Sequence, residues 1–203
     1  TRSNILAGFK SIISEAKPED VFVFYYAGHG TLNADNGEGF YLVPSEVTRM
    51  VDDAEQLDAK CISDAELKNN LTQLKSQKIV VIMDACHSGA AVSTIAVRAA
   101  GSEEKSIRML SRSSGVHIFA STGTKQYAAE FEQLQHGTFT YALLEALDGK
   151  ADQGADGQVT VSEIKLYMDE RVPELTKEFG GKAQYPAASM TGNDFPIAVP
   201  GKE

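Results

Sequence analysis

The chain has 203 residues, about the length of one domain and too short for two of ordinary size. Its 28 Asp and Glu against 19 Lys and Arg give a formal net charge of −9, which argues against nucleic-acid binding but favours a basic peptide if the acidity is focused in a cleft. No apolar run approaches the roughly 18 residues of a membrane span, so no membrane partner is predicted. The two cysteines, Cys61 and Cys86, are too few for a disulfide scaffold, so we expect a reduced, cytoplasmic setting.

Helices and buried strands alternate along the chain. Apolar residues recur at helical spacing in 3–16, whereas VFVFYY (21–26) and KIVVIMD (78–84) are continuous apolar runs of the kind that parallel sheets bury on both faces. The same reasoning predicts helices at 63–75, 138–147 and 164–172, strands at 40–43, 115–121 and 195–199, an irregular segment at 45–62 and a mobile surface loop at 90–115. This alternation predicts an α/β sandwich with a mostly parallel central sheet, in which ligands bind at the carboxyl ends of the strands.

Two of the predicted buried strands end in residues that carry chemistry. The first runs into Tyr26-Ala27-Gly28-His29-Gly30, and the second into Asp84-Ala85-Cys86-His87-Ser88-Gly89. If the two strands are parallel, both tips lie at the same edge of the sheet, and His29 and Cys86 meet although they are 57 positions apart. The sequence therefore predicts a thiol and an imidazole side by side.

Nucleophilic catalysis needs such a pair. A free thiol is mostly protonated at neutral pH, and a nearby imidazole can accept its proton and later donate one to a leaving amine. The backbone N–H groups of Gly30 and Cys86 are the predicted donors to a developing oxyanion. Each of the two motifs, taken alone, has a purely structural explanation. A buried cysteine is usually a small core residue, and a Gly-His-Gly turn is often architectural. Their occurrence together at two strand ends favours catalysis.

The two motifs, YYAGHG and DACHSG, resemble those of the caspase-like cysteine peptidases, and among these the metacaspase and prokaryotic orthocaspase branch. The segment ASTGTKQYAAE (120–130) and the helix HGTFTYALLEAL (136–147) extend the resemblance. It implies the caspase–hemoglobinase fold, a three-layer α/β sandwich. It also implies peptide hydrolysis through a Cys86 thioester, with His29 as general base and acid and with no organic cofactor.

The resemblance also shows a departure, because the family domain begins with a strand ahead of the first helix. We therefore expect residues 1–203 to form one peptidase domain that lacks this N-terminal strand. The missing strand would come from a companion N-terminal fragment or a larger assembly, because a gap in the sheet would leave backbone groups unpaired.

Asp84 is the predicted determinant of specificity. Residues i and i+2 of a strand share a face, so Asp84 and Cys86 both face the cleft, where a carboxylate attracts a cationic substrate side chain and repels an acidic one. In metacaspases the corresponding Asp is taken as part of the S1 pocket, which receives the residue before the scissile bond (P1), so the resemblance implies cleavage after Arg or Lys. Ala27 stands where metacaspases often have Ser, and one pocket hydrogen bond is then missing. The alternative is that Asp84 only caps the following turn.

Three further features have alternatives that the sequence leaves open. Four basic residues in the 90–115 loop, namely Arg98, Lys105, Arg108 and Arg112, are candidate sites of autocatalytic cleavage, or the loop is a solvated linker. The segment Asp152–Glu163 matches much of an EF-hand loop, but Gly154 supplies no ligand at its third position. Calcium binding and a tight helix–helix turn are therefore both open interpretations of this segment.

The whole domain has a rival interpretation as a catalytically idle caspase-like scaffold that binds a partner or a basic peptide. A metal hydrolase is set aside, since no closely spaced metal-ligand set is present in the sequence.

Overall fold

The central sheet has six strands in the order β3-β2-β1-β4-β5-β9. The computed structural model describes residues 1–32, 40–48, 54–85, 115–121, 130–131, 136–179 and 183–201. The strands are β1 (Val21–Leu32), β2 (Phe40–Val43), β3 (Ile62–Ser63), β4 (Lys78–Ala85), β5 (Gly115–Ala120) and β9 (Ala187–Met190). β1, β4 and β5 run parallel and form the centre, whereas β2, β3 and β9 pair antiparallel with their neighbours. The sheet is therefore mixed, with the predicted parallel strands at its middle.

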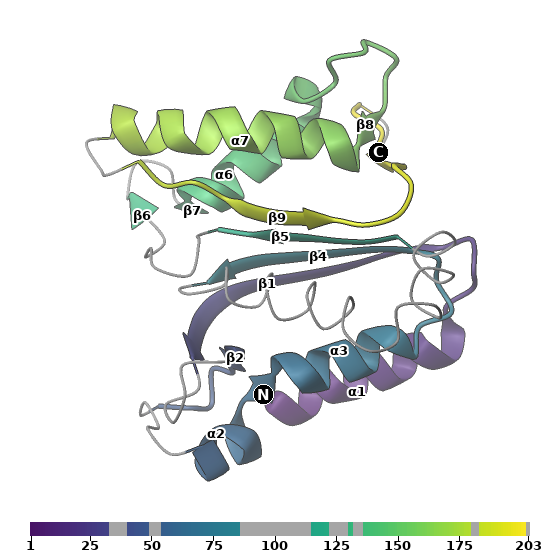
Figure 1. The fold of residues 1–203 in the computed structure, drawn as a ribbon, viewed down its shortest axis with the longest axis vertical. Coiled ribbons are helices and arrows are strands. Elements are labelled where there is room, and N and C mark those ends of the chain that lie inside the picture. The colour runs from purple at the N-terminus through teal and green to yellow at the C-terminus, as the bar shows by residue number, and fades with distance from the viewer. Residues whose placement is uncertain are drawn as a thin grey trace.

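Helices cover both faces of this sheet, which gives three layers (Figure 1). α1 (Arg2–Glu15) and α3 (Asp64–Thr72) pack on one face, and α6 (Thr138–Glu145) and α7 (Val161–Glu178) on the other. β4 shows why both faces need a cover: Ile79, Val81 and Met83 join the α1–α3 core, and Val80 and Ile82 join the α6–α7 core. The continuous apolar run thus predicted a doubly buried strand correctly.

The remaining elements are short and lie around these layers. They are α2 (Ala54–Lys60), the π-helical turn η2 (Ala146–Lys150), and the strands β6 (Glu130–Phe131), β7 (His136–Gly137), β8 (Val159–Thr160) and β10 (Pro196–Ala198). β8 pairs with β10, and β6 pairs with β7. None of the helices within the described residues is long and apolar enough to cross a membrane.

Two sequence expectations about these elements were wrong, and a third is not tested. Residues 54–60 form α2 within the segment predicted to be irregular, because Leu57 is buried beside Tyr41 and Cys61 in a small separate core. α7 continues through Pro173 to Glu178 instead of ending before the proline. An interior proline costs a helix about 3 kcal/mol, and here the buried side chains of Val172 and Leu175 hold the helix against the core. The predicted loop at 90–115 lies outside the described residues, apart from Gly115, which begins β5.

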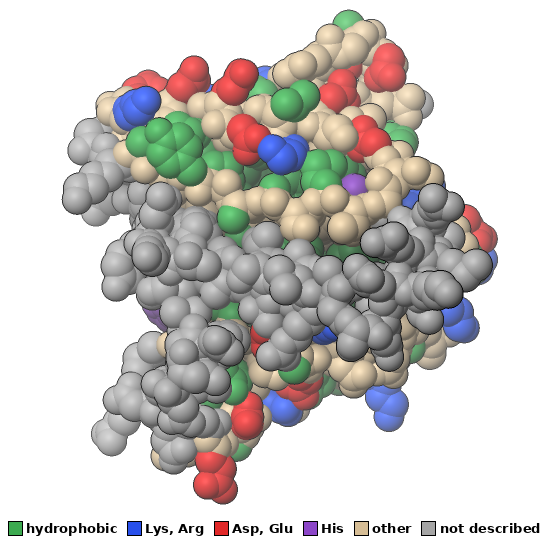
Figure 2. Space-filling model, viewed as in Figure 1, with side chains coloured by type: hydrophobic (Ala, Val, Ile, Leu, Met, Phe, Trp, Pro, Cys, Tyr) green, Lys and Arg blue, Asp and Glu red, His purple; other side chains and the backbone are tan. Residues whose placement is uncertain are grey.

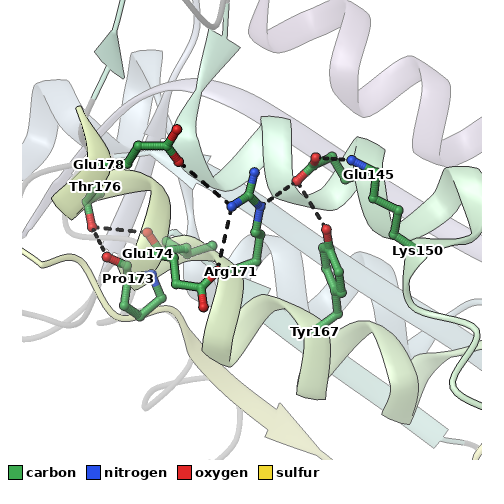
Figure 3. A network of polar contacts seen from close by, with 9 residues as sticks. Glu145, Lys150, Tyr167, Arg171, Pro173, Glu174, Thr176 and Glu178 are labelled. Atoms are coloured by element: carbon green, nitrogen blue, oxygen red, sulfur yellow. Dashed lines mark hydrogen bonds and ion pairs between the residues drawn. The ribbon is translucent and has the colours of Figure 1, made fainter.

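Glu145 fastens α6 to α7 through a cluster of ionic and polar contacts (Figure 3). Its side chain is almost buried, and its carboxylate accepts hydrogen bonds from Arg171 (2.8 Å), Tyr167 (3.1 Å) and Lys150. Burial opposes ionisation of this carboxyl, but the bonds from Arg171 and Lys150 outweigh it and hold the pKa of Glu145 below its usual value. The cluster therefore favours a charged Glu145 in the folded state.

Glu145→Ala is expected to lower the free energy of unfolding by about 2 kcal/mol, because it removes the buried partner of Arg171 and leaves this arginine only its two exposed partners, Glu174 and Glu178. The loss should also depend on pH. A folded-state pKa below the unfolded value adds stability above the unfolded pKa, and this stability disappears as the pH falls through the folded pKa. The difference between wild type and variant should therefore shrink on acidification, as measured by urea unfolding followed by circular dichroism.

Glu174→Ala is the matched control, because Glu174 approaches the same arginine at 3.6 Å but its side chain is 67% exposed. Exposed ion pairs contribute little, so this variant should stay within about 0.5 kcal/mol of wild type. Equal effects of the two substitutions would contradict the assignment of the stabilisation to the buried carboxylate.

Candidate active site

The parallel pairing of β1 with β4 sets the candidate site. Their register places Ala27 opposite Asp84 and Gly28 opposite Ala85, where the pairing ends. His29 is the next residue of β1, and Cys86 is the next residue of the sequence after Ala85. The predicted parallel relation of the two strands is thus correct. Cys86 itself lies outside the described residues, as do His87, Ser88 and Gly89.

The Gly-His-Gly segment lies within β1, whereas the sequence predicted a strand over 21–26 that ends in a Gly-His-Gly turn. β1 continues to Leu32, because β2 takes over as its partner where β4 ends, with His29 opposite Val43 and Gly30 opposite Leu42. His29 is exposed, and Gly30 is buried. The pairing of β1 thus changes from β4 to β2 at His29, and this residue is accessible at the carboxyl end of the parallel strands.

Alternation along β1 shows which face of the sheet carries the site. Phe22, Phe24 and Tyr26 pack into the α1–α3 core, so Tyr25, Ala27 and His29 belong to the opposite face, the one that α6 and α7 cover. On β4, Val80 and Ile82 mark the same face, and Asp84 continues their alternation. Ala27, His29 and Asp84 therefore share the α6 side of the sheet.

Asp84 is held by a chain of hydroxyl groups on this face. The Thr140 hydroxyl of α6 lies 2.5 Å from Asp84 Oδ2, and the Tyr25 hydroxyl of β1 lies 2.8 Å from Thr140 Oγ1. Asp84 is half-buried, and Tyr25 is 45% exposed. Three separate elements thus converge on the carboxylate that the sequence singled out.

Tyr26 fixes the backbone around His29 from the other face. Its hydroxyl donates to the carbonyl oxygens of His29 (2.9 Å) and Val43 (2.8 Å), and its burial raises its pKa to about 12. Its ring also explains Gly28, because a Cβ there would lie 3.0 Å from the Tyr26 hydroxyl oxygen and 3.1 Å from Cζ. Within the protein, Gly28 therefore makes room for Tyr26.

The EF-hand-like segment is internally bonded. Asp152 accepts the backbone N–H groups of Asp156 (3.2 Å) and Gly157 (2.9 Å), and Glu163 accepts those of Gly154 and Thr160. The Glu163 side chain and the Thr160 hydroxyl also form a capping box that starts α7. These hydrogen bonds form a tight turn ahead of α7, and calcium binding by this segment stays a prediction. Within the described ranges, no group of three or more His, Cys, Asp or Glu is arranged to hold a metal ion.

Cys61, which the structure describes, and His117 of β5 are core residues. Cys61 is 1% exposed, and burial raises the pKa of its thiol. His117 is also 1% exposed, with Nε2 of its ring 3.2 Å from the Asn193 carbonyl oxygen, to which it donates, and burial lowers its pKa. Neither lies at the end of β1 and β4, so neither belongs to the candidate site.

Comparison with known proteins decides the family. The family model of the caspase domain matches residues 1–195. The chain belongs to the caspase domain family. This makes it a caspase-like domain of the cysteine-peptidase type, as the motifs YYAGHG and DACHSG had predicted. The three-layer arrangement around a sheet with parallel central strands agrees with the fold which that resemblance implied.

The caspase domain is also similar to individual metacaspases. It is 29% identical over 91 residues to metacaspase-2 of Trypanosoma brucei brucei, covering 44% of this chain and 25% of that protein. It is 32% identical over 98 residues to metacaspase-1A of Aspergillus oryzae, covering 45% of this chain and 22% of that protein. The matched part is thus no more than 25% of either relative's length.

A solved structure shares the fold of this caspase domain. The crystal structure of protein GSU0716 from Geobacter sulfurreducens superposes with a TM-score of 0.54 and 16% sequence identity, covering 98% of this chain and 76% of that one. At this identity the likeness concerns the fold alone.

Proposed function

We propose that this caspase domain is a cysteine endopeptidase that cleaves peptide bonds after Arg or Lys. Family membership supports the cysteine-peptidase chemistry, and the register Gly28–Ala85 is the observation that carries the site. Neighbouring strands lie about 4.8 Å apart, and the Cα of Cys86 is one peptide step of about 3.8 Å from Ala85. A thiol after β4 is therefore within side-chain reach of the imidazole after Gly28.

The proposed reaction uses His29 twice. His29 takes the Cys86 thiol proton, and the thiolate attacks the scissile carbonyl carbon while the N–H groups of Gly30 and Cys86 stabilise the oxyanion. The C–N bond then breaks, and His29 donates its proton to the leaving amine, which leaves an acyl thioester. Water, deprotonated by His29, hydrolyses the thioester and restores the thiol. No organic cofactor or metal takes part in these steps.

Asp84 supports the proposed basic specificity. It lies opposite Ala27 on the same face as His29 and is partly accessible, so a P1 side chain near the dyad meets a carboxylate. On the face shown in Figure 2, the described acidic side chains are spread over both helical layers. The local carboxylate, more than the net charge of −9, is therefore the basis for recognising Arg or Lys.

Selective labelling of Cys86 tests the proposal against the idle-scaffold alternative. An arginyl chloromethyl ketone should label Cys86 and abolish cleavage of a fluorogenic arginyl peptide, whereas an aspartyl analogue should not. Cys61 is an internal control, because burial and its raised thiol pKa keep it unreactive. Equal labelling of both thiols, or none, would favour the scaffold. Running the assay with EDTA and with added calcium tests whether hydrolysis needs calcium.

The companion segment remains part of this proposal. β1 pairs with β4 over 21–28 and with β2 only from His29 onward, so the opposite edge of 21–28 has no partner strand among the described residues. Val21, Val23 and Tyr25 on its α6-facing side are 38%, 44% and 45% exposed. An added strand and helix would cover both features. Native mass spectrometry of active enzyme should find polypeptide beyond residues 1–203, in the same chain or in a second one, and full activity from residues 1–203 alone would contradict this.

A further inference from the structure

We infer that Thr140 and Tyr25 are specificity-positioning residues, a hydroxyl chain that holds the Asp84 carboxylate in the orientation that receives a cationic P1 side chain. The inference rests on the proposed function, since it assigns Asp84 to the substrate pocket. It adds two residues that neither YYAGHG nor DACHSG marks as functional: Thr140 lies outside both motifs, and Tyr25 is only the first letter of one.

The chemistry of the three side chains determines which group donates in each hydrogen bond. A carboxylate only accepts, so the 2.5 Å contact is a hydrogen bond from the Thr140 hydroxyl to Asp84 Oδ2. Thr140 has then used its one proton, and in the 2.8 Å contact the Tyr25 hydroxyl must donate to Thr140 Oγ1. Both donors therefore point toward Asp84, and hydrogen bonds aligned in this way strengthen one another.

These two hydrogen bonds can support the Asp84 carboxylate, because Thr140, which takes part in both, lies on a rigid helix. Thr140 lies in the first turn of α6, between Phe139 and Ala142, which are 1% and 0% exposed in the α6–α7 core. Asp84 is the last residue but one of β4, a central strand in which six of eight residues are buried. A carboxylate that is already held in place by a packed helix loses less conformational entropy when it binds a cation. Its fixed orientation therefore increases the affinity for a cationic P1 side chain.

A purely architectural role, fastening α6 to the sheet, predicts a different outcome. If the Thr140–Asp84 hydrogen bond only attaches α6 to the sheet, its loss would weaken binding of every peptide, because the whole site would become less ordered. Loss of carboxylate orientation would weaken binding only where the substrate carries a positive charge. The comparison that separates the two is arginine against citrulline at P1, because citrulline keeps the shape of arginine without its charge.

Binding is measured by calorimetry in the Cys86→Ala background, where no hydrolysis occurs, with peptides that differ only in Arg or citrulline at P1. Thr140→Val should weaken binding of the arginyl peptide about 10-fold and that of the citrullyl peptide less than 2-fold. Thr140→Ser, which keeps the hydroxyl, should restore most of the affinity, and Tyr25→Phe should cost about 3-fold. Tyr141→Phe, at the adjacent position of α6, is the matched control and should change nothing.

The coupling with Asp84 gives the sharpest test. In an Asp84→Asn background, Thr140→Val should have almost no further effect on arginyl binding, because the group it positions is gone. Additive effects, equal losses for both peptides, or failure of Thr140→Ser to rescue would overturn the inference. If the enzyme together with its companion segment hydrolyses no peptide, the proposed protease function fails, while the binding comparison still decides the role of Thr140. Tyr25→Phe removes one hydroxyl from a half-exposed residue and keeps the test open should Thr140→Val unfold the domain.

Discussion

Cys86→Ala is expected to lower kcat/KM for an arginyl peptide by at least about 1,000-fold, because it removes the nucleophile that forms the thioester. His29→Ala should cause a loss of similar size, since without the imidazole the thiol stays largely protonated and the leaving amine receives no proton. The measurement is release of a fluorogenic amine by purified variants under single-turnover conditions.

The two residues are proposed to act as a unit, and this has a measurable consequence. The double variant should be about as slow as the worse single variant, because either change alone already removes the concerted step. Cys61→Ala is the control for loss of a thiol, and it should leave kcat/KM unchanged, because Cys61 is buried away from the site. A His29→Ala enzyme that retains near-normal turnover would remove His29 from the mechanism.

Asp84→Asn is expected to lower kcat/KM for Arg and Lys substrates by about 100-fold, the loss of roughly 3 kcal/mol when a charge pair in a binding site is broken. The amide keeps the shape of the side chain, so cleavage after citrulline should change less than about 3-fold. The ratio of the two substrates is therefore the diagnostic quantity, determined from a P1 series containing Arg, Lys, citrulline, Ala and Asp.

Asp169→Asn provides the matched control for this substitution, because it removes an equal charge from a surface pair with Lys165 on α7. It should leave the Arg-to-citrulline ratio unchanged. Preference of the wild-type enzyme for Asp at P1, or an unchanged ratio in Asp84→Asn, would show that Asp84 has another role, such as capping the turn that follows β4.

Local patterns predicted most of the fold. Apolar continuity identified β1, β4 and β5, and the Ser63 cap marked the beginning of α3, where its hydroxyl accepts the Glu66 N–H at 3.1 Å. These signals succeed because they depend on neighbours within one or two turns of the chain. α2 and the passage of α7 through Pro173 were missed, because there burial against distant residues outweighs weak or unfavourable local preference.

The sequence by itself was enough to identify the family, through the motifs YYAGHG and DACHSG, and it proposed His29 and Cys86 as the reacting pair. The tertiary structure decided what surrounds them. Pairing with β2 turned the Gly-His-Gly segment into strand, Gly28 serves the ring of Tyr26, and Thr140 reaches Asp84 from a helix 56 positions further along the chain. Such contacts have no sequence period or motif, because they arise only when packing of the layers brings remote side chains to hydrogen-bonding distance.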